Sequence, residues 1–223
     1  MLRVMMFALV LLAARPALAQ QDQQALVDRA TLALQEVMTT GDRPQDAIAF
    51  LQRARAVMIC PRVFRAGFIL GGEGGGCVLA ARDGAGSWSS PAFYNMGSGS
   101  IGLQIGIQDA IVVMMIMTDA GLRAMMDSQF KLGAEAGIAL ATIGAGIEGG
   151  TTAAVGADIV AVARARGLFA GISVSGSLLT YQPGAAQAYY GREYSARQIV
   201  IAMEAHNPGA DPLRATLMRF GNR

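Results

Sequence analysis

The sequence has very few of the side chains that usually carry metal binding or acid–base catalysis. Its 223 residues include one histidine, His206, and two cysteines, Cys60 and Cys77, which form no Cys-x-x-Cys pair. Because a zinc site needs three or four such ligands, we predict no metal site and no cofactor. A serine nucleophile would need His206 as its base, and this residue stands beside Asn207-Pro208, where a surface role is commoner. We therefore predict that the protein is not an enzyme.

Long apolar runs are also missing, because the longest near the N-terminus, Val4 to Ala14, has only 11 residues. A membrane-spanning helix needs about 20 apolar residues, but a run of this length suits a secretory signal. Arg3 precedes the run, and the small residues Ala17 and Ala19 follow it. We expect residues 1–19 to be a signal peptide and the protein to be exported to the periplasm or cell envelope.

The expected mature chain has no net excess of positive or negative charge. Charged residues make up 15% of the sequence, below the usual value of about 25%. Removing residues 1–19 takes away Arg3 and Arg15, so 18 − 2 = 16 basic residues remain against 16 acidic ones. A neutral chain gives no reason to expect a nucleic-acid partner, so only local patches could attract anions. Lys131 is the only lysine, which suits arginine-based phosphate binding but also fits the bias of a GC-rich genome.

Glycine is abundant, at 28 residues, and short apolar runs between glycines indicate antiparallel strands. We predict one α+β domain over residues 20–223, with an antiparallel, β-rich core at 57–191 that is barrel-like or sandwich-like. Helices are expected at 22–56 before this core and at 195–220 after it. The helix at 22–38 is amphipathic and packs on a sheet or docks on a membrane surface; the pattern favours packing, because the polar face is not basic.

Alternating apolar residues predict particular strands and turns inside the core. Residues 101–108 and 130–141 each read as one strand, and 110–117 reads as a buried central strand. The run from Gly71 to Gly76 reads as a wide β-turn or a phosphate cradle. The turn is favoured, because the lysine and hydroxyl partners of a phosphate loop are missing. Residues 182–184 are expected to turn the chain.

The stretch from Ile159 to Leu179 reads as two strands that meet at a basic corner, Arg164-Ala165-Arg166-Gly167. Two guanidiniums beside a glycine form either an anion site or a solvated turn next to the core. The pattern alone favours the solvated turn. Cys60 and Cys77 lie in apolar strand-like segments, so they form either one disulfide or two buried thiols.

Several separated sequence blocks resemble the SYLF domain, which occurs in bacterial envelope proteins and, in eukaryotes, beside Src-homology-3 and FYVE modules. The resemblance covers roughly Leu26 to Leu217. The blocks that carry it are ICPRVFRAGFILGGEGGGCVLAARDGAGSWSSPAF, LQIGIQ, RARGLFAGISVSGS and the YYG of Tyr189 to Gly191.

The resemblance implies phospholipid binding without catalysis, and actin binding in the yeast members, which is not expected in a bacterial envelope protein. Where the family usually reads Tyr-Ser-Arg-Ser-Lys, this chain has Val162 to Arg166, so positive charge is kept and the hydroxyls are lost. Anionic phospholipids or a membrane surface are therefore the expected partners; a structural component that binds an envelope protein is the alternative. The expected phosphate contacts are Arg164, Arg166, Lys131, Arg62 and Arg65.

Overall fold

One curved sheet forms the centre of the molecule. The structure is a computed structural model that describes residues 2–40, 44–67, 70–101, 106–127, 129–132, 138–142, 156–166 and 176–222. Eight strands hydrogen-bond in the order β5-β8-β3-β2-β1-β4-β7-β6. They are β1 (Ala56–Gly67), β2 (Leu70–Ala81), β3 (Ala92–Ile101), β4 (Gly106–Ile116), β5 (Gln129–Lys131), β6 (Ile138–Thr142), β7 (Ile159–Arg166) and β8 (Leu178–Tyr181). All neighbours are antiparallel except β6 and β7, so the predicted antiparallel core is confirmed.

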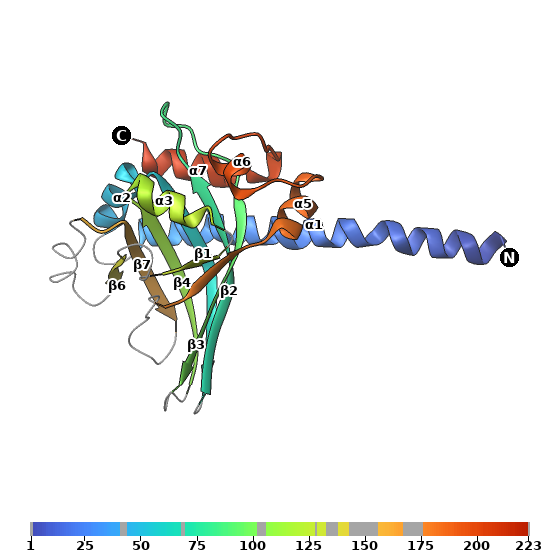
Figure 1. Cartoon of the computed structure of the whole chain (residues 1–223), viewed down its shortest axis with the longest axis horizontal. Coiled ribbons are helices and arrows are strands. Elements are labelled where there is room, and N and C mark those ends of the chain that lie inside the picture. The colour runs from blue at the N-terminus through green and yellow to red at the C-terminus, as the bar shows by residue number, and fades with distance from the viewer. Residues whose placement is uncertain are drawn as a thin grey trace.

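Helices flank this sheet, which curls into half a barrel, and the α+β class is thereby confirmed. Figure 1 shows the helices gathered around one end of the sheet, while β2 and β3 extend beyond them. The helices are α1 (Leu2–Thr39), α2 (Pro44–Arg53), α3 (Asp119–Met125), α5 (Pro183–Tyr190), α6 (Ala196–Val200), α7 (Asp211–Gly221) and the short 3-10 helix η2 (Pro208–Ala210). Within the described ranges, none of these helices has the length and apolar character needed to cross a bilayer.

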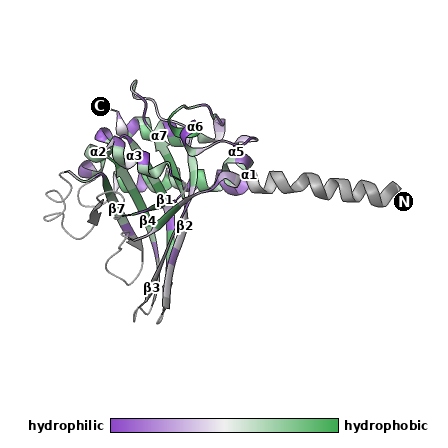
Figure 2. Ribbon diagram, viewed as in Figure 1, coloured by the Kyte–Doolittle hydropathy of each residue, from purple (hydrophilic) through white to green (hydrophobic). Residues whose placement is uncertain are grey.

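The two faces of the sheet follow from strand alternation. Gly76 of β2 lies against Leu26 of α1, and Phe93 of β3 packs its ring against Tyr189 of α5, so these positions mark the helix face. The next residue on each strand points to the inner face, where Tyr94 donates a hydrogen bond to the Met125 carbonyl of α3. Figure 2 shows hydrophobic residues concentrated where the helices meet β4 and its neighbours. This is the core.

Several helix predictions are confirmed and others change in extent. The predicted helix at 22–38 lies within α1, and Ser195 caps α6 with a reciprocal bond to Gln198. The helical region predicted to reach residue 56 ends with α2 at Arg53, because Ala56 already pairs with Ala81 in the sheet. Residues 182–184 are not a simple turn: α5 begins at Pro183, where the fixed φ and missing N–H of proline suit a first helical position.

Two strand predictions and one turn prediction are wrong, because apolar alternation does not show where one strand ends and the next begins. The predicted strand at 101–108 is split between β3 and β4, and the one at 130–141 between β5 and β6, which lie at opposite sheet edges. The run from Gly71 to Gly76 is not a turn but part of β2, paired with both β1 and β3. The predicted strand at 110–117 is confirmed as the buried part of β4.

Candidate functional site

The structure does not bring the five predicted phosphate contacts into one site. Arg62 and Arg65 lie on β1, Arg164 and Arg166 on β7, and Lys131 on β5 at the far edge of the sheet. The backbone of Arg166 pairs with Asp109 of β4, and its side chain lies outside the described part of the structure. Gly167 of the predicted basic corner, together with most of the strand predicted to follow it, also lies outside the described residues (167–175).

A cleft between α1 and the sheet is lined by one of these arginines, Arg62, and has a second, Arg164, beside it. The α1 cleft has a volume of about 420 Å³. It is lined by Arg29, Leu32, Ala33 and Glu36 of α1, Pro61 and Arg62 of β1, and Asp109, Ala110 and Ile111 of β4. Arg164 reaches its border by pairing with Glu36. Leu32 is 65% exposed and Phe64, beside Arg62, is 40% exposed, so the cleft combines basic groups with open apolar surface.

Arg62 is held by a carboxylate on the neighbouring strand. Its Nε donates to Asp109 Oδ1 at 2.9 Å and one Nη to Oδ2 at 3.0 Å, the bidentate geometry that suits a guanidinium. The hydrogen bond to Asp109, and after it the charge of that carboxylate, raise the pKa of the Arg62 guanidinium. The guanidinium also lies 5.7 Å from the centre of the Phe64 ring. Since the Arg62–Asp109 pair is exposed to solvent, phosphate oxygens can compete with Asp109 for the Arg62 guanidinium.

Arg164 is a strand residue, so the prediction of a solvated turn at this position is wrong. Its backbone pairs with Ile111 of β4. Its side chain donates a hydrogen bond to the Thr40 hydroxyl and forms an ion pair with Glu36 at 3.4 Å. Arg164 therefore ties β7 to the C-terminal end of α1 and is partly used by the fold.

Arg65 belongs to a buried network on the inner face and does not reach the α1 cleft. It pairs with Glu73 at 2.6 Å, and the other Glu73 oxygen accepts hydrogen bonds from the Ser98 and Ser177 hydroxyls at 2.8 and 3.0 Å. The side chain of Glu73 is only 3% exposed. A buried carboxylate that is fully hydrogen-bonded acts as a structural element, so Arg65 is engaged in packing.

Lys131 lies in a second groove on the other half of the sheet. The groove has a volume of about 580 Å³ and is lined mainly by Asn95, Gly97 and Gly99 of β3, Leu178 and Thr180 of β8, and Lys131. Among the described residues, no carboxylate pairs with Lys131. The sheet order separates this groove from the α1 cleft, since β5 and β7 are near opposite edges.

Arg29 is the cleft residue that sequence reasoning missed. It lies within the predicted helix at 22–38 and is exposed at the cleft without a carboxylate partner in the described ranges. A signal was available: Arg29, Leu32 and Glu36 recur at helical spacing on one side of α1. That pattern could not reveal that β1 and β4 pass beside it.

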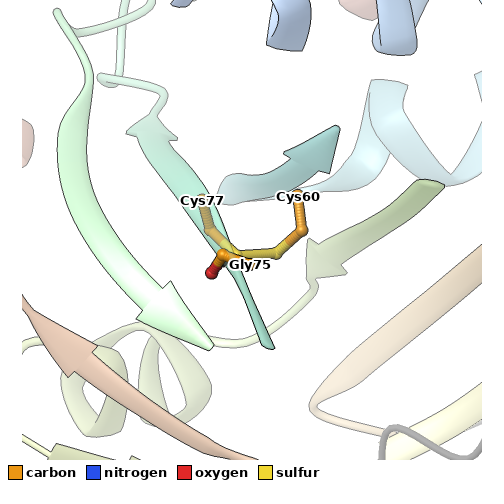
Figure 3. The surroundings of a disulfide bond; sticks show 3 residues. All are labelled: Cys60, Gly75 and Cys77. Atoms are coloured by element: carbon orange, nitrogen blue, oxygen red, sulfur yellow. Dashed lines mark hydrogen bonds between the residues drawn. A yellow bond between two sulfur atoms is a disulfide. The ribbon is translucent and has the colours of Figure 1, made fainter. Parts of the chain in front are cut away.

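Cys60 and Cys77 are joined by a disulfide across β1 and β2 (Figure 3), with Cα atoms 4.2 Å apart. Both cysteines are buried. The carbonyl oxygen of Gly75 lies 3.9 Å from the Cys77 sulfur. Cys60 directly precedes Pro61 and lies two residues before Arg62, and both of these residues line the α1 cleft.

The described residues contain no group of three or more His, Cys, Asp or Glu side chains placed to hold a metal ion. The structure thus offers charged and apolar surfaces for binding.

Comparison with known proteins supplies the context for these surfaces. Residues 97–220 match the family model Ysc84, described as Las17-binding protein actin regulator. The chain is 30% identical over 192 residues to an SH3 domain-containing protein of Schizosaccharomyces pombe, covering 85% of this chain and 43% of that protein. It is 29% identical over 166 residues to LAS seventeen-binding protein 3 of Saccharomyces cerevisiae, covering 73% and 36%.

A human relative, SH3 domain-containing YSC84-like protein 1, is 27% identical over 159 residues, which cover 71% of this chain and 46% of that protein. The chain therefore spans less than half the length of these relatives. The match to the family model includes Lys131, Arg164 and Arg166 and begins after the α1 cleft residues of α1 and β1.

Proposed function

Since this chain belongs to the Ysc84 (SYLF) family, we propose that it is a non-catalytic binding module that contacts anionic phospholipid head groups at the α1 cleft. The observation that carries the proposal is Arg29, an exposed guanidinium without a carboxylate partner among the described residues, beside the exposed side chain of Leu32. A cation next to open apolar surface suits a membrane interface, where the charge meets phosphate and the apolar group enters the acyl boundary.

The charges around the cleft also support this ligand. Among the described side chains in or beside the cleft, three arginines (Arg29, Arg62 and Arg164) stand against two carboxylates, Glu36 and Asp109. Arg62 keeps its bidentate geometry toward Asp109 in an exposed position, and a phosphate offers the same pair of acceptor oxygens. Binding would exchange one acceptor for the other without burying a new charge.

The test is flotation with vesicles of phosphatidylglycerol and phosphatidylcholine, compared with phosphatidylcholine alone. The parent protein is expected to float only with the anionic vesicles. Arg29→Gln is expected to weaken the partition coefficient about fivefold, since a basic residue near an anionic surface contributes about 1 kcal/mol. Arg123→Gln is the matched control, because Arg123 is an exposed arginine on α3. Equal binding of Arg29→Gln and Arg123→Gln would reject the cleft as the contact.

An envelope protein is the alternative partner, because the family model and a relative are named for binding the protein Las17. This alternative predicts no flotation of the parent with either vesicle composition.

We also propose that residues 1–19 direct export and that the protein works in the periplasm or cell envelope. The apolar run with its small residues at positions 17 and 19 supports this location, and a disulfide is compatible with an oxidising compartment. The mature chain is then expected to begin near Gln20. The intact mass of protein isolated from the periplasmic fraction tests this expectation, and an uncleaved cytoplasmic chain would contradict it.

A further inference from the structure

Strand β1 contains one residue more than either of its neighbours near Cys60. Between Ile59 and Phe64 the strand advances five residues while β2 advances four, from Val78 to Gly74. Against β4, the three steps from Cys60 to Val63 match two steps on the partner strand. This is a β-bulge, and Pro61 lies in it, because a proline is tolerated inside a sheet only where the ladder is already interrupted.

The bulge determines which face of the sheet receives Arg62. With regular alternation Arg62 would share the inner face with Cys60, two residues before it. The additional residue instead places Arg62 on the helix face, where it lines the α1 cleft and pairs with Asp109. A slip of the bulge by one residue would turn the guanidinium to the inner face, away from the α1 cleft.

Gly75 of β2 makes room for this bulge. A Cβ atom on Gly75 would lie 2.1 Å from the carbonyl oxygen of Arg62 and 3.1 Å from its carbonyl carbon. Backbone therefore fills the space that any side chain at position 75 would need. Gly72, on the same strand, would place a Cβ 3.8 Å from its nearest neighbour, an ordinary contact.

The bulge is bracketed on both sides by cross-strand links. The Cys60–Cys77 disulfide joins β1 to β2 immediately before the bulge (Figure 3), and the buried Arg65–Glu73 pair joins the same strands just after it. Each link fixes the pairing of the two strands at its own position. With both in place, the extra residue cannot migrate along β1.

We propose that Gly75 and the Cys60–Cys77 disulfide are positioning residues for Arg62: together they hold the bulge that presents the Arg62 guanidinium to the α1 cleft. The effect on ligand binding rests on the proposed function. The placement of Arg62 beside Asp109 does not, so the two can be tested separately.

The experiment compares Gly75→Ala with Gly72→Ala in the full chain, after circular dichroism has established that each variant is folded. The Arg62 Nε–H resonance, assigned with Arg62→Gln, reports the contact with Asp109, because Asp109→Asn should shift it in the parent. In the Gly75→Ala variant, Asp109→Asn is expected no longer to shift the Arg62 resonance. Gly75→Ala is also expected to weaken binding to phosphatidylglycerol vesicles about fivefold, the effect of removing one cation from the membrane contact. Gly72→Ala is expected to keep both properties. An unchanged Arg62 resonance in folded Gly75→Ala would overturn the proposal for Gly75.

A double-mutant cycle separates positioning from general destabilisation. If Gly75 acts through Arg62, adding Arg62→Gln to Gly75→Ala should cause no further loss of vesicle binding, whereas adding it to Gly72→Ala should still cost about fivefold. Additive losses would contradict the proposal.

Should Gly75→Ala fail to fold, Cys60→Ser/Cys77→Ser provides the second test. It is expected to shift and broaden the Arg62 Nε–H signal while the fold persists, and an Arg62 signal identical to the parent's would reject the role of the disulfide. If the parent protein does not bind anionic vesicles at all, the proposed function fails, and the Arg62 resonance alone decides the positioning proposal.

Discussion

At the scale of single residues, Arg82 joins two helix ends to the sheet. Its Nη atoms donate to the carbonyl oxygens of Leu51 and Gln52 in α2 and of Gly221 in α7, at 3.2, 3.0 and 2.6 Å. The guanidinium lies 4.7 Å from the centre of the Trp88 ring. Carbonyl groups at helix C-termini carry partial negative charge and favour a cation. Burial lowers the pKa of Arg82, but a guanidinium stays charged at neutral pH.

We expect Arg82→Met to reduce the free energy of unfolding by about 2–3 kcal/mol, because buried carbonyl groups lose a charged donor. Urea titration followed by the fluorescence of Trp88, the single tryptophan, measures the change. Arg123→Met is the control, since exposed positions usually change stability by at most about 0.5 kcal/mol. Equal urea midpoints of unfolding for Arg82→Met and Arg123→Met would show that the carbonyl contacts of Arg82 do not stabilise the fold.

At the scale of elements, tyrosines hold α5 against α1 and β3. Tyr189 donates to Gln24 Oε1 at 3.1 Å, and Tyr190 donates to the carbonyl oxygen of Pro91 at 2.6 Å. Burial raises the pKa of both phenols well above the usual value. Burial raises the pKa of Tyr181 to about 12. The folded state therefore favours the neutral phenols.

The consequence is a loss of stability in alkali. In the unfolded chain tyrosine ionises near pH 10, so the stabilising effect is complete below about pH 10. It is lost as the pH rises from there through the folded pKa values. We expect absorbance at 295 nm and circular dichroism to change together above pH 10. Phenols that ionise near pH 10 while the dichroism stays native would contradict this coupling.

Local sequence patterns predicted the elements that have clear start signals or strong periodicity. The C-terminal helical region begins at the predicted residue, where Ser195 caps α6, and the amphipathic pattern located the packed part of α1. Alternation failed at residues 101–108 and 130–141, since small and apolar residues keep the same period across the boundary between two strands. The α1 cleft could not be predicted, because it depends on which strands neighbour β1 and on a bulge that alternation does not reveal.

At the scale of the whole molecule, the sheet order divides the predicted phosphate contacts between two separate surfaces. Lys131 lies on β5 at one edge of the sheet, whereas Arg62 and Arg164 lie on β1 and β7, on either side of β4. A membrane that meets the α1 cleft would contact the second group and not the first. The arrangement therefore predicts that substitutions removing one positive charge weaken binding to anionic vesicles to different extents, depending on which surface carries the residue.

We expect Lys131→Gln to change binding to phosphatidylglycerol vesicles by less than about twofold and Arg62→Gln to weaken it about fivefold, because only a cation near the surface contributes about 1 kcal/mol. Partition coefficients measured at two salt concentrations test this, since the loss in Arg62→Gln should shrink as salt screens the charge. A loss in Lys131→Gln equal to that in Arg62→Gln would move the contact surface to the Lys131 groove. Salt-independent binding in every variant would instead show that apolar side chains such as Leu32 and Phe64 dominate the contact.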